Sequence, residues 1–398
     1  MFWVGVDVAK DFHSAAVRDS LGVQQGDVLD FSNDAAGFAS FFQWLFDLDI
    51  SSLDSLICME ATGHYWRNLA ASLASAGFSV SVVNPMQIEA FRKAETVRKV
   101  KTDKTDALLI ADFARFKNLE ANYSCLDTEG LKRLTRYRSH LIHERTQLKN
   151  KLSAAIHELF PALPKLLGGI SSASFLALVS AYSSPSAILK TDVSVLGELL
   201  SVASRGRFGV EKAELLQEFA ASNIGPNDDA ALAFEVSHLA EMILFYNGKV
   251  ADLEREISSL VSETDAKLLQ SIPGVGVLGA AVILGEISDP TRFKNAKALM
   301  AYSGMDATVR QSGKYEGMAA HMSKRGCSYL RYMLMLCADS ARRNDPYFGE
   351  YYKSLRARNK HHYVAVSACA RKLCGVILTV LKEKRPYEHR EPIQLKES

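Results

Sequence analysis

The order of short β-branched runs near the N-terminus constrains the fold of this 398-residue chain more than any other feature. Three runs come first: FWVGVDVA at 2–9, HSAAVRD at 13–19 and DVLDFS at 27–32. Apolar and β-branched residues separated by short polar links are typical of neighbouring strands. The sequence therefore predicts an N-terminal sheet that begins with three antiparallel strands.

Helices and strands alternate after these runs. A helix capped by Asn33 or Asp34 is followed by the strand SLICMEATG at 55–63, a second helix, the strand SVSVVNP at 79–85 and a helix at 104–115. This order resembles the ribonuclease H fold, so the predicted fold class of the N-terminal part is α/β and ribonuclease H-like. The resemblance is one of topology and does not define a function.

The rest of the chain has a helical pattern. Leucines recur at three- to seven-residue intervals among charges over 128–160, and a similar stretch covers 229–262, which together predict an antiparallel coiled-coil hairpin. The segment between them, at about 161–228, carries no recognisable chemistry. A small all-α segment with two basic helices is expected to follow. Because a chain of this length exceeds one core, we expect domains at 1–125, 126–265 and 266–385 and a polar tail at 386–398.

Charge is distributed unevenly along the chain. The net charge is +2, but residues 291–398 contain 21 lysines and arginines against 9 acids, a net of +12 that leaves residues 1–290 at −10. This asymmetry favours a polyanionic partner for the C-terminal part, although an ordinary solvated surface can carry similar charge. The six cysteines include no C-x-x-C pair, which predicts reduced structural thiols. No apolar run reaches the length of a membrane span and no signal peptide is evident, so we expect a cytoplasmic protein without membrane contact.

Four carboxylates occupy unusual positions for charged residues. Asp7 interrupts the apolar strand VGVDVA, and Glu60 lies where the strand LICME ends. A charge in such a strand is costly unless it is paired or bound to a metal. Asp103 and Asp106 are three residues apart at the start of a helix, so both project from one face. Each alone has a plainer explanation as a turn or capping residue, but together they predict a metal site.

Carboxylate ligands that converge on one point repel one another unless a cation neutralises them. Ligation by oxygen alone points to Mg²⁺, with Mn²⁺ as the alternative, rather than to zinc. Asp7, Glu60, Asp103 and Asp106 are therefore predicted to be both metal ligands and catalytic acids.

Two C-terminal motifs supply further candidates. IPGVG resembles a helix-hairpin-helix element, in which Gly274 and Gly276 let backbone N–H groups approach a DNA phosphate; an ordinary turn is the alternative. RQSGK places Ser312 in a basic loop, although Ser-Gly alone is a common turn. A serine that attacks phosphorus needs charge stabilisation, which neighbouring cations offer: Arg310, Lys314, Lys324, Arg325 and Arg331.

Taken together, these motifs resemble one family. GVDVAKD, MEATGHYW, KTDKTDALLIA, IPGVG, the SGK loop and SKRGCSYLR follow the order found in the DEDD transposases of the one-hundred-ten insertion-sequence family, relatives of the Piv invertases. The resemblance extends over nearly the whole chain. It implies a RuvC-like N-terminal domain, a coiled coil and a small C-terminal transposase domain. It also implies action on double-stranded donor and target DNA, guided by a structured bridge RNA.

The resemblance also assigns roles to residues. It implies that Asp7, Glu60, Asp103 and Asp106 form the metal tetrad and that Ser312 forms a transient phosphoserine link to DNA. Many relatives have two serines in this loop where the chain has one, so Ser323 is the alternative nucleophile. The family's assembly implies a homo-oligomer, a dimer of dimers, in which the acids of one subunit lie beside another's transposase domain. Further contacts to nucleic-acid backbone are expected from Arg98 and Lys101.

Two other functions remain open. In a Holliday-junction endonuclease of the RuvC type, the same acids would activate water and no covalent intermediate would form. In a non-catalytic assembly factor, the coiled coil would oligomerise and the basic C-terminus would bind DNA, but the acids in the strands would then be unexplained. A DNA transposase or serine-type site-specific recombinase remains the favoured function.

Overall fold

Two units make up the computed structural model, residues 1–127 and 128–398. The described residues are 1–95, 102–123, 128–226, 228–307, 311–312, 315–316 and 321–389. Each unit encloses its own hydrophobic cores.

A five-stranded sheet forms the centre of the first unit. β1 (Phe2–Val8), β2 (Phe12–Arg18) and β3 (Gln24–Ser32) are antiparallel neighbours. β4 (Ser55–Glu60) lies parallel to β1 on its other side, and β5 (Ser79–Val83) lies parallel to β4. The strand order is β3-β2-β1-β4-β5, which confirms the predicted mixed α/β region. The assignment of this sheet to the ribonuclease H fold stays a prediction.

Helices cover both faces of the sheet. Alternate residues of a strand face opposite sides, so Val4 and Val6 pack with α1 (Ala35–Asp47) and α2 (Trp66–Ser75), whereas Trp3 packs with α3 (Pro85–Glu95) and α4 (Asp103–Phe116). Asp34 caps α1 by accepting from the Gly37 amide at 2.8 Å, one of the two predicted caps. The sequence pattern did not predict α3, in which only Ile88 and Phe91 are buried.

Gly5 brings α4 into direct contact with β1. A Cβ atom at this position would lie 2.2 Å from the Ala107 carbonyl oxygen and 2.3 Å from the Ala111 amide nitrogen. Both contacts are to backbone atoms of α4, which cannot move aside as a side chain can. The start of α4, with Asp103 and Asp106, is therefore held close to the end of β1.

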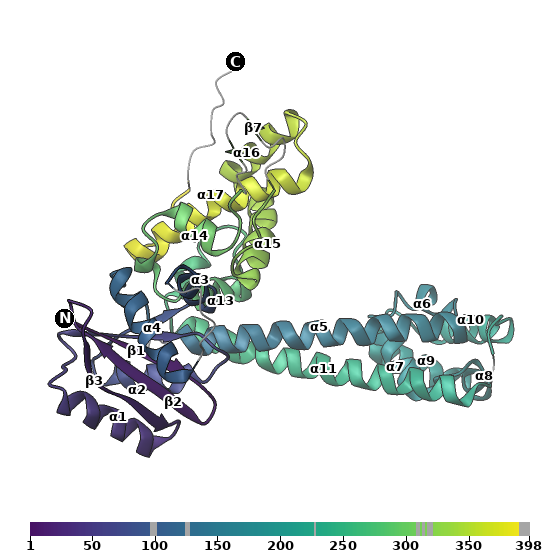
Figure 1. The fold of residues 1–398 in the computed structure, drawn as a ribbon. Helices are drawn as coiled ribbons and strands as arrows, with labels where there is room; N and C mark the ends of the chain where they lie inside the picture. The colour runs from purple at the N-terminus through teal and green to yellow at the C-terminus, as the bar shows by residue number, and fades with distance from the viewer. Residues whose placement is uncertain are drawn as a thin grey trace. The chain divides into compact units, whose positions relative to one another are not determined.

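Two long helices form an antiparallel pair in the second unit (Figure 1). α5 (Thr128–Leu159) and α11 (Ala230–Ser262) match the two predicted helical stretches. Arg138 of α5 pairs with Glu254 of α11, and Arg145, further along α5, donates to Asn247, which comes earlier on α11. The opposite order of partners shows that the helices run in opposite directions. Their coiled-coil geometry stays a prediction.

The segment between the long helices is also helical. It contains α6 (Leu163–Leu166), α7 (Ala173–Ala181), α8 (Pro185–Lys190), α9 (Val193–Ser204) and α10 (Val210–Ala221). These helices share one core with the end of α5 and the beginning of α11, through Ile156 and Val236 among others. The segment thus caps the distal end of the helix pair.

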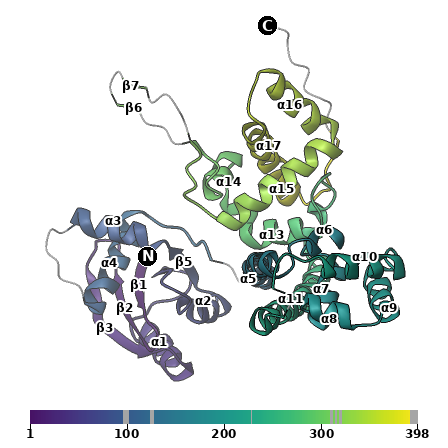
Figure 2. The same cartoon turned by 90° about the vertical axis from the view of Figure 1, so that its right-hand side faces the viewer.

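The C-terminal helices pack around the other end of the pair (Figure 2). They are α12 (Ala266–Leu269), α13 (Val277–Ile287), a 3-10 turn at Pro290–Arg292, α14 (Ala296–Tyr302), α15 (Ser328–Asn344), α16 (Pro346–Ala357) and α17 (His362–Glu383). A two-stranded ribbon, β6 (Gln311–Ser312) and β7 (Tyr315–Glu316), follows α14. α17 is long and apolar enough to span a membrane, but 67% of its most apolar window is buried, as in the core helix of a folded unit.

Candidate functional site

Three residues of the sheet form a polar row at the end of β1. Asp7 pairs in register with Ser14 of β2, and Ser14 pairs with Asp30 of β3. Laterally paired residues place their side chains on the same face of a sheet, here the face covered by α4. Ser14 is buried and its hydroxyl donates to Asp30 Oδ1 at 2.5 Å. The row thus joins Asp7 to a carboxylate that no sequence pattern singled out.

The N-terminus of α4 lies beside this polar row. The Thr102 side chain caps the helix by accepting from the Thr105 amide at 3.2 Å. The Thr105 side chain in turn accepts from the Thr102 amide, which completes a capping box. Asp103, in the first turn, lines a cavity of about 520 Å³ together with Asp7, Ser14 and Asp30. Lys104, also in its wall, lies 3.5 Å from Asp30. Two of the four predicted acids, Asp7 and Asp103, are therefore brought to one cavity.

Asp106 lies one turn further along α4 and has a cationic partner. It is 5% exposed, and its Oδ1 lies 2.5 Å from Arg92 Nη1 of α3. The hydrogen bond from Arg92 to Asp106 raises the pKa of the guanidinium, and attraction to Asp106, Glu89 and Glu60 adds to this effect. Arg92 therefore lies in the field of two tetrad carboxylates. Nothing in the sequence pattern predicted this ion pair.

Glu60 ends β4 as predicted, and its side chain is half-buried. Thr62 Oγ1 donates to Glu60 Oε1 at 2.7 Å. Asp7 is also half-buried. Both lie at or near the ends of their strands, and Asp106 is the buried member of the predicted tetrad.

The donors at the cavity fit a hard divalent cation. Mg²⁺ in proteins is commonly held by one or two carboxylates and keeps water and substrate phosphate as its other ligands. Asp7 and Asp103 meet that requirement. Among the residues that the structure describes, no group of three or more His, Cys, Asp or Glu side chains is gathered for a metal. The other two predicted acids have partners within the protein: Asp106 forms an ion pair with Arg92, and Glu60 accepts a hydrogen bond from Thr62.

The predicted serine lies in the ribbon that follows α14. The backbone of Ser312 belongs to β6 and pairs with Tyr315 of β7. The neighbouring predicted cations Arg310 and Lys314 lie outside the described residues, and so do Arg98 and Lys101 of the first unit.

The alternative serine, Ser323, has a defined environment. Its hydroxyl donates to Asp306 Oδ1 at 2.5 Å, and its amide donates to the Asp306 carbonyl at 2.9 Å. Lys324 and Arg325, which follow it, are exposed. Arg331 instead donates from Nη1 to the Ser303 carbonyl at 2.9 Å. At least one of its donors therefore holds the turn after α14.

The two predicted DNA-contacting glycines differ in their surroundings. Gly274 has a φ of +94°, and a Cβ there would lie 2.4 Å from the Ala341 amide nitrogen of α15. Its lack of a side chain is thus explained by close packing of the IPGVG turn on α15. Gly276 caps α13 with open space around it. The expected helix-hairpin-helix stays a prediction, since the helix before the turn, α12, is a single turn of four residues.

A buried ion pair anchors the helices around this turn. Glu286 of α13 has no exposed side-chain surface and accepts from Arg136 of α5 at 2.6 and 2.8 Å. Cys327, the N-cap of α15, donates from Sγ to Glu286 Oε2 at 3.2 Å. Burial, and then the negative charge of Glu286, raise the pKa of the Cys327 thiol. The only sequence signal for this cluster is a lone acid, Glu286, in the apolar run VLGAAVILGEI.

Two family models match the chain. The model of the IS110-type DEDD transposases, described as a transposase, matches residues 4–161. A second model, described as the transposase IS116/IS110/IS902 family, matches residues 266–353. The first match contains the carboxylate cavity, and the second contains the IPGVG turn and both serines. Together the two segments cover more than half of the chain.

Known proteins also match most of the chain. The insertion element IS116 protein of Streptomyces clavuligerus is 25% identical over 98% of this chain and 97% of its own. The insertion element IS110 protein of Streptomyces coelicolor is 28% identical over 74% of each chain. The pilin gene-inverting protein of Moraxella lacunata is 23% identical over 98% of each. The family models and these relatives agree, and the chain belongs to the IS116/IS110/IS902 family of transposases.

Proposed function

We propose that this transposase cleaves and rejoins double-stranded DNA by combining the acidic cavity of its first unit with a serine nucleophile from its C-terminal ribbon. The observation that carries the proposal is the meeting of Asp7 and Asp103 in one cavity, with Asp106 one helical turn away. The strand order of the sheet also supports a ribonuclease H-like, RuvC-like assignment for this unit.

Asp7 and Asp103 would hold Mg²⁺ or Mn²⁺ at this cavity. The cation would polarise a phosphate oxygen and stabilise the charge that develops during attack. Asp30, held by Ser14 and Lys104, would add negative charge and a hydrogen-bond acceptor at the cavity wall. Asp106, whose Oδ1 accepts from Arg92, would supply a further carboxylate one helical turn along α4.

The serine step breaks one phosphoester bond and forms another, so their number does not change. Ser312 Oγ attacks the phosphorus atom and loses its proton, the P–O bond to one DNA strand breaks, and the departing strand oxygen takes up a proton. A phosphoserine diester results. Attack by a hydroxyl of the recipient strand reverses these changes, restores the serine and needs no external energy source.

An adduct assay tests this proposal. The full chain is incubated with donor DNA and Mg²⁺ and quenched with detergent, and the covalent protein–DNA adduct is measured by gel electrophoresis. We expect the wild type and Ser323→Ala to form the adduct, and Ser312→Ala, Asp7→Asn and Asp103→Asn to lose it at least a hundredfold. An adduct that persists in Ser312→Ala but disappears in Ser323→Ala would move the role to Ser323. Free hydrolytic ends that are insensitive to both substitutions would favour the RuvC-type endonuclease.

The proposal includes a guide RNA and an assembly. The net charge of +12 over residues 291–398 supports a polyanionic partner for this segment. We expect a discrete structured bridge RNA to co-purify with the chain, and a mass corresponding to a dimer of dimers when donor and target DNA are bound. Sequencing of the bound RNA and light scattering of the complex test the two statements separately.

A further inference from the structure

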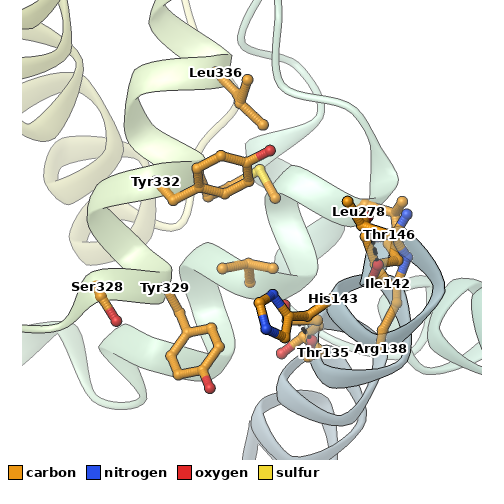
Figure 3. A pocket seen from close by; sticks show the side chains of 13 residues that line it. Thr135, Arg138, Ile142, His143, Thr146, Leu278, Ser328, Tyr329, Tyr332 and Leu336 are labelled. Atoms are coloured by element: carbon orange, nitrogen blue, oxygen red, sulfur yellow. Dashed lines mark hydrogen bonds between the residues drawn. The ribbon is translucent and has the colours of Figure 1, made fainter. Parts of the chain in front are cut away.

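A second cavity, of about 670 Å³, lies between α5, α13 and α15 within the second unit. Figure 3 shows Tyr329, Tyr332 and Leu336 projecting from α15 on one side, with Arg138 and His143 of α5 on the other. Ligand pockets for small molecules typically measure about 300–1,000 Å³, so a nucleoside-sized group fits. The described residues that line this cavity include none of Asp7, Glu60, Asp103, Asp106 and Ser323.

Tyrosine rings and apolar side chains line this cavity. Leu278 and Val282 of α13 and Met333 of α15 contribute apolar surface. Tyr332 is 65% exposed, so one face of its ring is accessible at the cavity mouth. An exposed tyrosine beside an apolar surface is what a planar aromatic ligand requires for stacking.

The polar part of the cavity lies mainly on α5. No aspartate or glutamate is among the described residues that line it. Arg138 is the arginine among them, and it pairs with Glu254. Arg136, which Glu286 holds, lies 5.1 Å from the centre of the Tyr329 ring, and His140 lies 3.3 Å from the Tyr329 hydroxyl. Aromatic rings beside apolar side chains and an arginine are suited to stack a nucleobase.

We propose that this cavity receives an unstacked nucleobase of the nucleic-acid partner, with Tyr332 as the stacking residue and Arg138 in the facing wall. The proposal rests on the proposed function only in taking a nucleic acid as the partner. A duplex cannot present a base face in this way, so the ligand is a single-stranded segment or an extruded base. A second copy of this chain is the alternative occupant, and the oligomeric mass of the variant distinguishes it.

Binding of a short single strand tests the proposal. The probe is a fluorescein-labelled twelve-residue thymidine oligonucleotide, measured by anisotropy with the full chain in EDTA. Loss of one base–aromatic stack corresponds to about a fivefold to hundredfold loss of affinity. We expect this loss for Tyr332→Ala but not for Tyr332→Phe, which keeps the ring. Tyr363→Ala is the matched control, because Tyr363 is 68% exposed on α17 and lies outside the cavity.

Two further measurements control for phosphate contacts and for folding. An abasic oligonucleotide of equal length should bind the wild type and Tyr332→Ala equally, because only phosphate contacts remain. Thermal melting of each variant establishes that it is folded. Equal affinity of wild type and folded Tyr332→Ala for the thymidine probe would overturn the proposal, and so would a change of oligomeric mass in Tyr332→Ala without loss of binding, which would assign the cavity to a second copy. Because the assay contains no divalent cation and no cleavage, its outcome is independent of the serine and metal assignments.

Discussion

Arg92 and Asp106 form an ion pair that ties α3 to α4 and occupies the buried carboxylate of the tetrad. Arg92 engages Oδ1 of Asp106, so a divalent cation at this oxygen would compete with the guanidinium. The guanidinium balances a charge that would otherwise be buried alone.

Arg92→Ala should destabilise the first unit by about 2 to 4 kcal/mol, because it leaves Asp106 buried without a partner. Adding Mg²⁺ should recover part of this loss and raise the melting temperature more in the variant than in the wild type. Lys93→Ala is the control, since Lys93 is 74% exposed and pairs with the exposed Glu89. Equal responses of all three proteins to Mg²⁺ would contradict a competition at Asp106. Melting curves with and without MgCl₂ provide the measurement.

Gly5→Ala should separate α4 from β1. The new methyl group would meet backbone atoms of Ala107 and Ala111, so we expect a loss of about 3 kcal/mol or more, at the upper end of overpacking effects. Adduct formation should fall with it, because Asp103 moves away from Asp7. Gly248→Ala in α11, where a Cβ meets nothing, should instead be neutral or stabilising. Denaturant unfolding and the adduct assay measure the two effects.

Glu286→Gln should destabilise the second unit by about 2 to 3 kcal/mol, since it removes the charge that Arg136 faces in a buried site. The figure is kept below that of a fully buried pair because the Arg136 side chain is 36% exposed. Glu350→Gln removes an exposed partner of Lys353 and should change stability by no more than about 0.5 kcal/mol. Similar losses in the two variants would show that burial of Glu286 is not what gives the pair its strength. Urea unfolding is the measurement.

Gly274→Ala and Gly276→Ala should have different consequences. At Gly274 a positive φ and the contact with the α15 backbone combine, and we expect a loss of about 3 kcal/mol or more. Gly276→Ala should fold normally. If the amides near Gly276 approach a phosphate, this variant should bind duplex DNA more weakly. Unchanged DNA binding by Gly276→Ala would argue against a phosphate contact there and leave packing on α15 as the reason for Gly274 alone.

His13 should make the first unit sensitive to mild acid. It is 1% exposed, and burial lowers its pKa below the usual 6.5, an effect that a hydrogen bond with Asn33 opposes only in part. The unfolded chain therefore takes up a proton before the folded chain does. The contribution of His13 to stability is full above about pH 6.5 and is lost as the pH falls toward the folded pKa. The loss amounts to about 1.4 kcal/mol for each pH unit that separates the folded pKa from the unfolded pKa.

Stability measured by urea unfolding from pH 7.5 to 5 tests this effect. His13→Asn should have a flatter profile than the wild type, whereas His64→Asn, at an exposed position, should keep the wild-type slope. A wild-type slope in His13→Asn would assign the acid sensitivity to another group.

Local pattern was enough to predict the main elements of the fold. Strand alternation predicted β1 to β5, and leucine spacing predicted α5 and α11, because these elements bury a regular face of their own. Helix α3 was missed because its buried face consists of two residues after a proline. The segment at 161–228 was not resolved into five short helices, since each buries too few residues for its period to be visible.

The site was predicted in part. Asp7 and Asp103 stood out as acids in an apolar strand and at a helix start. Asp30 did not, because a carboxylate in an alternating edge strand looks like any outward-facing residue, and its connection to Ser14 depends on strand register. The partners of Asp106 and Glu286 come from helices 14 and 150 residues away in sequence, so only the tertiary structure identifies them.

The antiparallel helix pair also sets a fixed length within the second unit. Leu131 belongs to the core around the C-terminal helices and Ile156 to the core of the distal helices, and 25 residues of continuous α-helix between them span about 38 Å. The pair therefore acts as a spacer whose length is counted in helical turns. Deleting seven residues from α5 and the facing seven from α11 would shorten it by about 10 Å while the same sides of the helices still face each other.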